Sequence, residues 1–390
     1  MTTKNKLLEN LPEGNALSGL VLVGCTLASL LFANLLFKQT YLDFWTNPIA
    51  GISLLHLIND GLMTIFFLVV GLEIKKEIQI GELANFKKAF LPFFCALGGM
   101  IAPATIYYVL NFGTNNVSGW GIPTATDIAF SIGILAILGS RIPHGLKIFL
   151  TALAIIDDLG AVVVIALFYS KEISFVNLSF AIGLTLLLWI LLRFAKFYNI
   201  LLWTIVGCGI WYFLYHSGIH STIAGVLLAA VTPVKYKNKN PLEKIAKGLH
   251  KSVNYFIIPL FAIANTAILI NGDVISAITS SISVGIILGL FIGKPLGIML
   301  FAYVSTKLGW AQLPNQVNWR LLLGAAILAG IGFTMSLFVS FLAFKDIYRQ
   351  DIAKIAILLG SLIASIMGLL YLHFTLNNID SESKNRERKA

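Results

Sequence analysis

The chain has 390 residues, of which 57% are hydrophobic and only 12% are charged, and its mean hydropathy is +0.85. Soluble domains carry about 25% charged residues, so these values exclude an ordinary soluble enzyme, a disordered chain and a small disulfide-framed secreted module. They favour a polytopic membrane protein, since a helix of about 20 apolar residues crosses a bilayer. The three cysteines, Cys25, Cys95 and Cys208, lie in apolar stretches without metal-ligand spacing, so they are interpreted as small core residues.

Twelve apolar runs follow one another along the chain, and each is expected to cross the membrane as a helix. They cover residues 15–36, 54–74, 89–112, 121–139, 148–169, 174–195, 199–215, 218–233, 252–272, 281–303, 320–344 and 355–376. No low-complexity linker separates them, so residues 1–376 are predicted to form a single all-α transmembrane domain. The polar and basic segment 377–390 is expected to be a disordered cytoplasmic tail.

Basic residues are distributed unequally between the segments that join these runs. With both termini placed in the cytoplasm, the inner segments and the tail hold 22 lysines and arginines, whereas the outer segments hold five. An excess of Lys and Arg on the cytoplasmic side orients membrane proteins. The formal charge of +10 is therefore interpreted as a topology signal, and nucleic acid is not an expected partner.

Two of the runs contain residues that weaken a continuous helix. The fourth run contains Gly121, Pro123 and Asp127, and the eleventh contains Gly330 and Gly332. Irregular backbone at membrane depth is tolerated where protein or a water-filled cavity surrounds it. Interrupted helices in corresponding places indicate an inverted-repeat transporter with its site near the midplane. Runs three to five and ten to twelve are the predicted repeats, and the alternative is that these glycines only let helices pack closely.

Ionisable side chains inside apolar runs are functional candidates by default, because each charge costs at least about 2.5 kcal/mol to insert. Asp157 and Asp158 are adjacent in the middle of the fifth run, and Lys294 lies in the tenth. Two neighbouring carboxylates either lie beside a cation or hold protons, and carboxylate oxygens suit hard cations. The pair therefore predicts a site where a hard cation and protons compete. A structural ion pair with Lys294 is the alternative, although it would leave one aspartate unpaired.

Four other ionisable residues are weaker candidates. Asp127 follows the predicted break and could neutralise the positive N-terminal ends of facing half-helices, as Lys294 could neutralise carbonyl ends. A structural countercharge without a role in turnover is the alternative for both. Asp60 lies within the second run and Glu73 near its end. His220 is interpreted either as lining a polar path or as a buried structural histidine.

Several long motifs resemble the NhaA-type sodium/proton antiporters of bacterial inner membranes. They are INDGLMTIFFLVVGLEIKKE (58–77), GWGIPTATDIAFSIGILAILGSR (119–141), KIFLTALAIIDDLGA (147–161), SGIHSTIAGV (217–226), IIPLFAIANT (257–266), GKPLGI (293–298) and GIGFTMSLF (330–338). The similarity extends over residues 10–376 with all twelve runs in order. It implies an NhaA-like fold of about twelve helices with inverted repeats and two interrupted helices, in a multi-pass protein of the bacterial inner membrane.

The resemblance also implies roles for individual residues. Asp157 and Asp158 would bind the transported cation and the proton. The residues beside them would be Thr126 and Asp127 in the interrupted fourth helix, and Lys294 would be the intramembrane lysine of the family. Asp60 would line the cytoplasmic funnel, and four residues match positions tied to pH regulation, namely Glu73, Lys76, Glu77 and His250.

One cytoplasmic segment departs from the family pattern. Better-known members carry an acidic residue and a histidine before the ninth helix, where this chain has Ala246 and Lys247. The exchange chemistry is expected to be kept, since no intramembrane carboxylate is affected. The pH response is expected to differ.

The predicted function is secondary active transport that exchanges cytoplasmic Na⁺ or Li⁺ for external H⁺ by alternating access, electrogenically and under pH control. The expected partners are these ions and the lipid bilayer, a homodimer is one oligomeric state left open, and neither an enzyme activity nor a cofactor is expected. Two alternatives remain. An intramembrane aspartyl protease would need two aspartates on separate facing helices, and no Gly-x-Gly-Asp motif occurs. A passive cation channel would conduct without proton counterflow.

Overall fold

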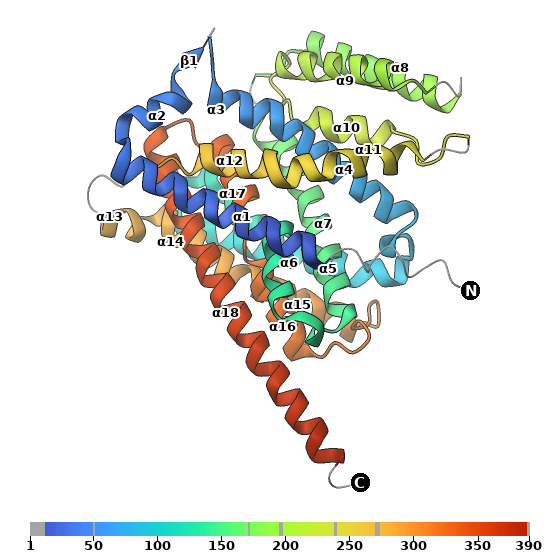
Figure 1. Cartoon of the computed structure of the whole chain (residues 1–390), viewed down its shortest axis with the longest axis vertical. Coiled ribbons are helices and arrows are strands. Elements are labelled where there is room, and N and C mark those ends of the chain that lie inside the picture. Colours follow the sequence, from blue (N-terminus) through green and yellow to red (C-terminus); the bar gives the residue numbers. More distant parts are fainter. Residues whose placement is uncertain are drawn as a thin grey trace. The chain divides into compact units, whose positions relative to one another are not determined.

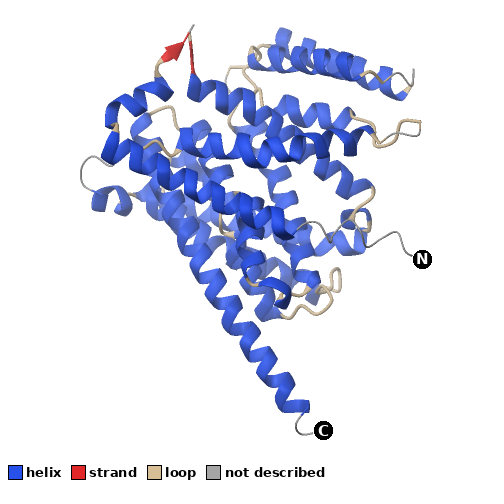
Figure 2. Ribbon diagram, viewed as in Figure 1, coloured by secondary structure: helices blue, strands red, loops and turns tan. Residues whose placement is uncertain are grey.

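The structure is a computed structural model that describes residues 12–49, 51–170, 172–194, 198–237, 240–269 and 274–387. Most of these residues are helical, as Figure 2 shows. The two short strands among them, β1 (Pro48–Ile49) and β2 (Ile52–Ser53), pair antiparallel with Pro48 opposite Ser53. Apart from this hairpin, the described part of the chain contains only helices and their connections, which confirms the predicted all-α class.

Nine membrane spans are identified by length and composition within the described residues. Eight are single stretches, and the ninth is a helix pair bent by 45°, α16 (Trp319–Ala329) with α17 (Phe333–Ala343). The eight stretches are Leu17–Leu36, Leu54–Gln79, Ala89–Leu110, Val117–Ile137, His144–Phe168, Phe175–Arg193, Ser281–Lys307 and Ile347–Ile379. These spans coincide with nine of the twelve predicted apolar runs, so the polytopic membrane character is confirmed.

The other three predicted runs coincide with shorter apolar helices. They are α9 (Ile200–Tyr215), α10 (Ile223–Val231) and the π-helix η6 (Val253–Ile257) continued by α12 (Ile258–Asn265). At a rise of about 1.5 Å per residue, the nine residues of α10 extend only about 14 Å, whereas the hydrocarbon core is about 30 Å thick. Length alone therefore sets these helices apart from the nine longer spans, although all twelve runs are helical.

The chain divides into two compact units, each made of several separate segments. Unit 1 consists of Met1–Val21, Asn85–Asp158 and Asn271–Ala390, and unit 2 consists of Leu22–Ala84 and Leu159–Ile270. The sequence predicts one domain over residues 1–376 because no linker interrupts it. Packing between segments distant in sequence defines the units, and the chain passes from one unit to the other several times. The single-domain assignment stays a prediction.

Unit 1 contains the third and fourth predicted runs, the first part of the fifth as far as Asp158, and the tenth to twelfth. Its elements, shown in Figure 1, are the first part of α1 (Pro12–Leu31), α5 (Phe86–Leu110), η4 (Val117–Thr124), α6 (Ile128–Ile137), η5 (Gly139–Arg141), the first part of α7 (His144–Phe168), α13 (Val274–Thr279), α14 (Ser281–Leu288), η7 (Gly289–Gly293), α15 (Lys294–Lys307), α16, α17 and α18 (Ile347–Glu387). The two predicted repeats therefore meet in one compact unit.

Glycines bring α5 and α15 into close contact within unit 1. A Cβ atom added at Gly98 would collide with the carbonyl oxygen of Gly297, and a Cβ at Gly297 would collide with that of Gly98. A Cβ at Gly293 would also lie only 2.9 Å from the backbone of Pro103. These glycines of the third and tenth runs therefore serve close helix packing, as small residues commonly do in membranes.

Unit 2 contains the remaining elements. They are the rest of α1 and of α7, η1 (Phe32–Leu36), α2 (Lys38–Thr46), β1, β2, α3 (Leu54–His56), η2 (Leu57–Leu62), α4 (Met63–Gln79), η3 (Glu82–Ala84), α8 (Phe175–Arg193), α9, α10, α11 (Pro241–Ser252), η6 and α12. In this unit α4 packs against α10 and α11, and α8 packs beside α9 (Figure 1).

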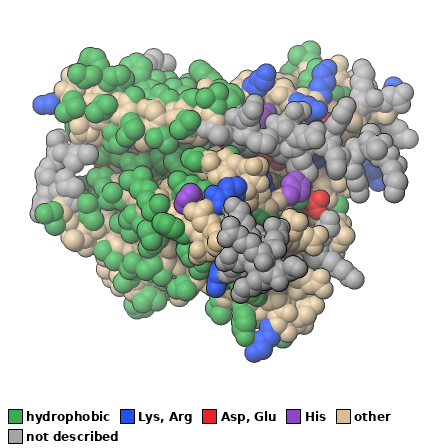
Figure 3. Space-filling model, turned by 60° about the horizontal axis from the view of Figure 1, so that its bottom comes forward, with side chains coloured by type: hydrophobic (Ala, Val, Ile, Leu, Met, Phe, Trp, Pro, Cys, Tyr) green, Lys and Arg blue, Asp and Glu red, His purple; other side chains and the backbone are tan. Residues whose placement is uncertain are grey.

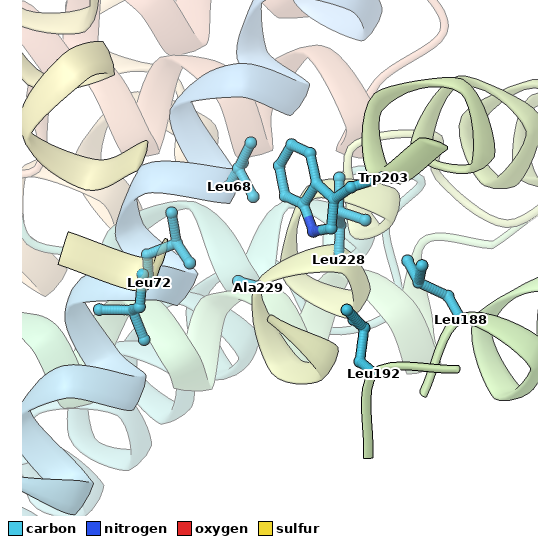
Figure 4. Packing of buried hydrophobic residues seen from close by; sticks show 8 residues of the cluster. Leu68, Leu72, Leu188, Leu192, Trp203, Leu228 and Ala229 are labelled. Atoms are coloured by element: carbon cyan, nitrogen blue, oxygen red, sulfur yellow. The ribbon is translucent and has the colours of Figure 1, made fainter. Parts of the chain in front are cut away.

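A hydrophobic cluster joins five helices of unit 2 and is drawn in Figure 4. Its members are Leu68 and Leu72 of α4, Leu188 and Leu192 of α8, Trp203 of α9, Leu228 and Ala229 of α10, and Leu242 of α11. The indole Nε1 of Trp203 donates to Thr232 Oγ1 at 3.0 Å. This bond satisfies the polar edge of a buried aromatic ring, so the cluster is apolar without leaving that donor unpaired.

Many large hydrophobic side chains are exposed. Examples are Phe175 and Val176 on α8 and Leu201 and Ile205 on α9. Figure 3 likewise shows hydrophobic side chains over much of one face of the molecule. Contiguous apolar surface of this extent marks a membrane or interaction surface, which agrees with helices that face lipid.

The last helix is longer than the sequence predicts. The segment after Leu376 is expected to be disordered, whereas α18 continues to Glu387. Residues 369–387 contain neither glycine nor proline, the two residues that most oppose a helix, so nothing local ends it. Residues 388–390 lie outside the described part of the chain.

Candidate functional site

Both predicted interruptions are present, and they lie against each other in unit 1. The 3₁₀ segment η4 ends at Thr124, three non-helical residues follow, and α6 begins at Ile128. The second interruption separates Ala329 at the end of α16 from Phe333 at the start of α17. The backbone N–H of Asp127 donates to the carbonyl oxygen of Ile331 at 2.6 Å. The broken backbone is thus satisfied partly by its counterpart in the other repeat.

The carboxylate of Asp127 caps the N-terminal ends of both outgoing half-helices. Its Oδ1 accepts from the backbone N–H of Phe130 in α6 at 2.9 Å. Its Oδ2 accepts from the backbone N–H of Thr334 in α17 at 3.1 Å and from the Thr334 hydroxyl at 2.6 Å. Helix N-termini carry partial positive charge and unpaired N–H groups. These hydrogen bonds are those expected of a countercharge for two facing half-helices.

Lys294 lies at the same crossing and contacts the C-terminal, carbonyl end of a broken helix, whereas Asp127 contacts N-terminal ends. Its side chain is fully buried at the start of α15, and its Nζ donates to the carbonyl oxygen of Thr124 at 2.6 Å. Thr124 ends η4, so the ammonium group meets the carbonyl end of a broken helix. The same Nζ lies 3.0 Å from Oδ2 of Asp157, which is also fully buried.

Asp157 of α7 has one engaged oxygen and one open oxygen. Oδ2 faces Lys294 and accepts from the hydroxyl of Thr126 at 2.6 Å. That hydroxyl also lies 2.9 Å from the carbonyl oxygen of Ala329. Oδ1 of Asp157 is buried and accepts no hydrogen bond from the described residues. Buried polar atoms are nearly always partnered, so this open oxygen is unusual.

Asp158 follows on the same helix and is 1% exposed. Lys294 interacts electrostatically with Asp158 as well as with Asp157. When both carboxylates are ionised, the cluster has two negative charges and one positive charge. The charge of Asp127 is offset separately, because each of the two helix N-termini that it caps carries about half a positive charge. The cluster is therefore one positive charge short, which is costly in a buried site.

The residues matched to pH regulation gather in unit 2, where α4 packs against α11. Oε1 of Glu73 lies 3.5 Å from Nδ1 of His250, and both side chains are partly exposed. The hydrogen bond to Glu73 raises the pKa of His250 above its ordinary value of 6.5, against the smaller opposing effect of partial burial. Glu77 accepts from the backbone N–H of Glu82 at 3.0 Å, in the turn that follows α4.

The segment that departs from the family pattern is part of the helix α11. Lys247 Nζ lies 2.9 Å from Oε1 of Glu243, one turn earlier. That hydrogen bond lowers the pKa of Glu243, and the charge of Lys76 acts in the same direction. Ala246 packs against the hydrophobic cluster of Figure 4. The two substituted positions therefore face different surroundings.

Asp60 does not belong to this pH-related group. It lies in η2, 13 residues before Glu73 in the same span, which corresponds to about 20 Å along a helix. Its Oδ1 instead lies 3.7 Å from Nδ1 of His220, and both side chains are largely buried. The role of Asp60 in the cytoplasmic funnel stays a prediction. The structure pairs it with His220, the candidate for a polar path.

Sequence reasoning gave no individual role to several polar residues that the structure places at the crossing of the broken helices or near Asp60. Their shared signal is a hydroxyl or amide group within an apolar run, and they are Ser131, Thr334, Ser336, Asn59 and Asn265. Asn59 and Asn265 form a reciprocal amide pair, with hydrogen bonds of 3.3 and 2.8 Å. Such residues have no charge to single them out, so only the partner helix reveals their contacts.

Comparison with known proteins gives matches over nearly the whole chain. The family described as Na⁺/H⁺ antiporter 1 matches residues 9–372. The chain is 50% identical to the Na(+)/H(+) antiporter NhaA of Flavobacterium psychrophilum over 374 residues, which are 96% of this chain and 97% of that relative. It is 45% identical to the NhaA antiporter of Dechloromonas aromatica over 381 residues, covering 97% and 98% of the two chains. For the NhaA antiporter of Proteus mirabilis the identity is 42% over 381 residues, covering 95% and 97%.

Proposed function

The chain belongs to the Na⁺/H⁺ antiporter 1 family, and from this premise we propose that it exchanges cytoplasmic Na⁺ for external H⁺ at Asp157 and Asp158. The resemblance noted in the motifs is thereby confirmed. The observation that carries the proposed site is the missing positive charge in the buried cluster of Asp157, Asp158 and Lys294. One Na⁺ supplies that charge, and protons on the two carboxylates remove the need for it. The two kinds of ion compete because they bind the same carboxylates.

The exchange follows from alternating access to one site. In this scheme Na⁺ binds when the site is open to the cytoplasm, and protons bind when it is open to the outside. Each ion favours the conformation that it binds better, so the movement of Na⁺ is coupled to the movement of protons. Two adjacent carboxylates can take up two protons where they bind one cation. We therefore propose that each cycle moves net charge and that the inward proton gradient expels Na⁺, or Li⁺, from the cytoplasm.

Two charged residues at the broken helices, Asp127 and Lys294, keep their charge throughout the proposed transport cycle and hold the helix ends in place. Asp127 holds two helix N-termini, and Lys294 holds the carbonyl end of η4. Preorganised dipoles of this kind hold a charged ligand near the midplane without bulk water. In this scheme Thr126 orients Asp157 through its 2.6 Å hydrogen bond.

We further propose that the protein lies in the bacterial inner membrane, where a proton gradient is available, and that the group around Glu73 and His250 adjusts activity to cytoplasmic pH. The support is that Glu73, in the last part of α4, lies 3.5 Å from His250 of α11. The basic-residue count places this end of α4 inside. In this role the antiporter would serve pH homeostasis and salt tolerance.

The direct test uses everted membrane vesicles, a proton gradient and a fluorescent pH probe. Adding Na⁺ should collapse the gradient with the native chain and not with Asp158→Asn, because an amide cannot alternate between a cation and a proton. Asp346→Asn, which removes a carboxylate whose side chain is 55% exposed, is the matched control and should behave like the native chain. Sodium-dependent proton release by Asp158→Asn close to that of the control would contradict the site.

The same vesicles distinguish the alternatives. A passive channel would let Na⁺ in without releasing protons, even at saturating Na⁺. An aspartyl protease would cleave a membrane-embedded peptide, yet Asp157 faces Lys294 at 3.0 Å instead of a second aspartate on a facing helix. That contact favours ion exchange over protease chemistry.

A further inference from the structure

Two serines occupy the same position in the two outgoing half-helices of unit 1. Ser131 is the fourth residue of α6, which starts at Ile128, and Ser336 is the fourth residue of α17, which starts at Phe333. Both side chains are fully buried. Their equivalent positions in the two repeats suggest a common task.

Each serine donates to a carbonyl oxygen of the other interrupted span. The hydroxyl of Ser131 donates to the carbonyl of Leu328 near the end of α16 at 3.0 Å. The hydroxyl of Ser336 donates to the carbonyl of Ile122 near the end of η4 at 2.7 Å. The last carbonyl groups of a helix lack partners within it. The Leu328 carbonyl accepts the Ser131 hydroxyl in addition to the backbone N–H of Ile331 at 3.1 Å, and the Ile122 carbonyl accepts the Ser336 hydroxyl.

This behaviour differs from that of most hydroxyl groups in the chain. Buried serines and threonines in helices usually donate to a carbonyl one turn earlier in their own helix, and many here do so, among them Thr26, Thr151 and Ser365. Ser340 lies on the same helix as Ser336 and is equally buried. Its hydroxyl donates to the carbonyl oxygen of Leu337 within that helix at 2.8 Å. Position four is where both half-helices make the same crossed bond to a carbonyl, whereas Thr126 and Thr334 make single crossed bonds without such a counterpart.

A glycine leaves the space that one of these bonds needs. A Cβ atom added at Gly332 would collide with the hydroxyl oxygen of Ser336 and lie 2.9 Å from Leu290. The φ angle of Gly332 is −93°, which other residues adopt without strain. Glycine is therefore needed at position 332 because a larger residue would occupy the space of the Ser336 hydroxyl, and not because of the backbone conformation.

We propose that Ser131 and Ser336 are a reciprocal pair of positioning residues, which hold the two broken helices in register and so set Thr126 against Asp157 and Asp127 against the start of α17. This inference rests on the proposed exchange at Asp157 and Asp158. The serines do not touch the transported ion. They fix the crossing at which Thr126 reaches Asp157 and at which Asp127 reaches the start of α17.

The test measures apparent Na⁺ affinity and maximal exchange rate per transporter in everted vesicles, with the amount of inserted protein determined for each variant. Ser131→Ala and Ser336→Ala should each raise the Na⁺ concentration for half-maximal exchange by about two- to tenfold, the factor that corresponds to one hydrogen bond. The maximal rate should change little. Ser340→Ala, which loses only a bond within its own helix, should match the native chain in both quantities.

A second variant tests the pair without removing a hydroxyl. Gly332→Ala should mimic Ser336→Ala by displacing its hydroxyl, and combining the two should add no further loss, because residues that act through one contact are not additive. If both serine variants keep an apparent Na⁺ affinity within about twofold of Ser340→Ala, a change below that of one hydrogen bond, the positioning role is overturned. Absence of sodium-dependent exchange in the native chain would instead overturn the proposed function, so the two failures are distinguishable.

Discussion

The three buried aspartates of unit 1 differ in how their carboxylates are satisfied. Both oxygens of Asp127 accept hydrogen bonds from two helix starts, whereas Asp157 keeps a buried oxygen without a partner among the described residues. A fully satisfied carboxylate is held in one protonation state, while an open one can exchange ligands. The sequence suggests a countercharge role for Asp127 apart from the Asp157–Asp158 pair, and the hydrogen bonds show how differently Asp127 and Asp157 are satisfied.

The contact between Glu73 and His250 makes a prediction about pH. The pKa of His250 is raised above 6.5 by Glu73, so the folded state favours the charged imidazole. The stabilising contribution is complete below the pKa of the unfolded chain and is lost as the pH rises through the raised pKa of the folded chain. Partial exposure of both side chains means that solvent screens the pair.

Glu73→Gln should therefore lower the thermal midpoint at acidic pH and leave it nearly unchanged at alkaline pH. We expect a difference of about 1–2 °C at pH near 5.5, the size of a screened ion pair, shrinking toward zero by about pH 9. Thermal unfolding of detergent-purified protein across this range checks it. Glu172→Gln, at an exposed loop position, is the control and should give a constant offset, and a constant offset for Glu73→Gln as well would show that the pair does not titrate.

At the level of single residues, the sequence identifies charges better than neutral polar groups. Asp157, Asp158 and Lys294 stand out because charge is rare in apolar runs. Thr334 and Ser336 do not, because a hydroxyl in a membrane helix can satisfy itself one turn back. Their roles depend on carboxylate and carbonyl groups about 200 positions earlier in the chain, a relation that no local pattern encodes.

At the level of elements, glycine and proline mark special backbone without saying which kind. In the fourth and eleventh runs they coincide with real interruptions. In the third and tenth runs Gly98 and Gly297 lie inside regular α-helices that approach each other closely. The same residue types serve both purposes, so the choice between them requires the neighbouring helix.

This distinction predicts the effect of adding one methyl group in α15. Gly297→Ala should destabilise unit 1, because its Cβ would collide with the backbone of Gly98, which cannot rotate away as a side chain could. Overpacking of this kind costs about 1–3 kcal/mol, partly offset by about 0.5–1 kcal/mol of better helix propensity for alanine. The thermal midpoint of the purified protein should fall by several degrees.

Gly183→Ala provides the matched control. Gly183 lies in the interior of α8 with no heavy atom within 4 Å of an added Cβ. Only the propensity gain then remains, so the midpoint should stay level or rise slightly. Equal effects of the two substitutions would show that α5 and α15 are not held as closely as the structure has them.

The helix α11 explains one departure from the family pattern. Ala246 packs on the hydrophobic cluster, while its neighbour Lys247 pairs with Glu243. A carboxylate at position 246 would lie against Leu and Trp side chains, where a charge is costly. The missing acidic residue thus fits the apolar packing of this chain, and the changed pH response predicted from Ala246 and Lys247 stays a prediction.

At the scale of the whole molecule, charge and hydropathy predict the membrane spans but not the contacts between them. The apolar runs predict every long span, since a bilayer demands length and continuity. The grouping of those spans into two units was not predictable, because unit 1 unites residues 85–158 with 271–390. Segments that far apart are associated by packing, and the packing surfaces of membrane helices are nearly as apolar as their lipid-facing sides.

Orientation is the last property that the sequence predicts for the whole molecule, and labelling from either side of the membrane tests it. Single cysteines would be introduced by Ala84→Cys, Lys235→Cys and Asn115→Cys, all at exposed positions, in a background without the three native cysteines. The 22-to-5 distribution of basic residues places the first two inside and the third outside. A membrane-impermeant maleimide should therefore label position 115 in intact cells and positions 84 and 235 only in everted vesicles. Retained sodium-dependent exchange in each variant shows that the fold is kept. Label reaching position 235 from outside would reverse the orientation, and with it the direction of proton and sodium movement that the proposed exchange requires.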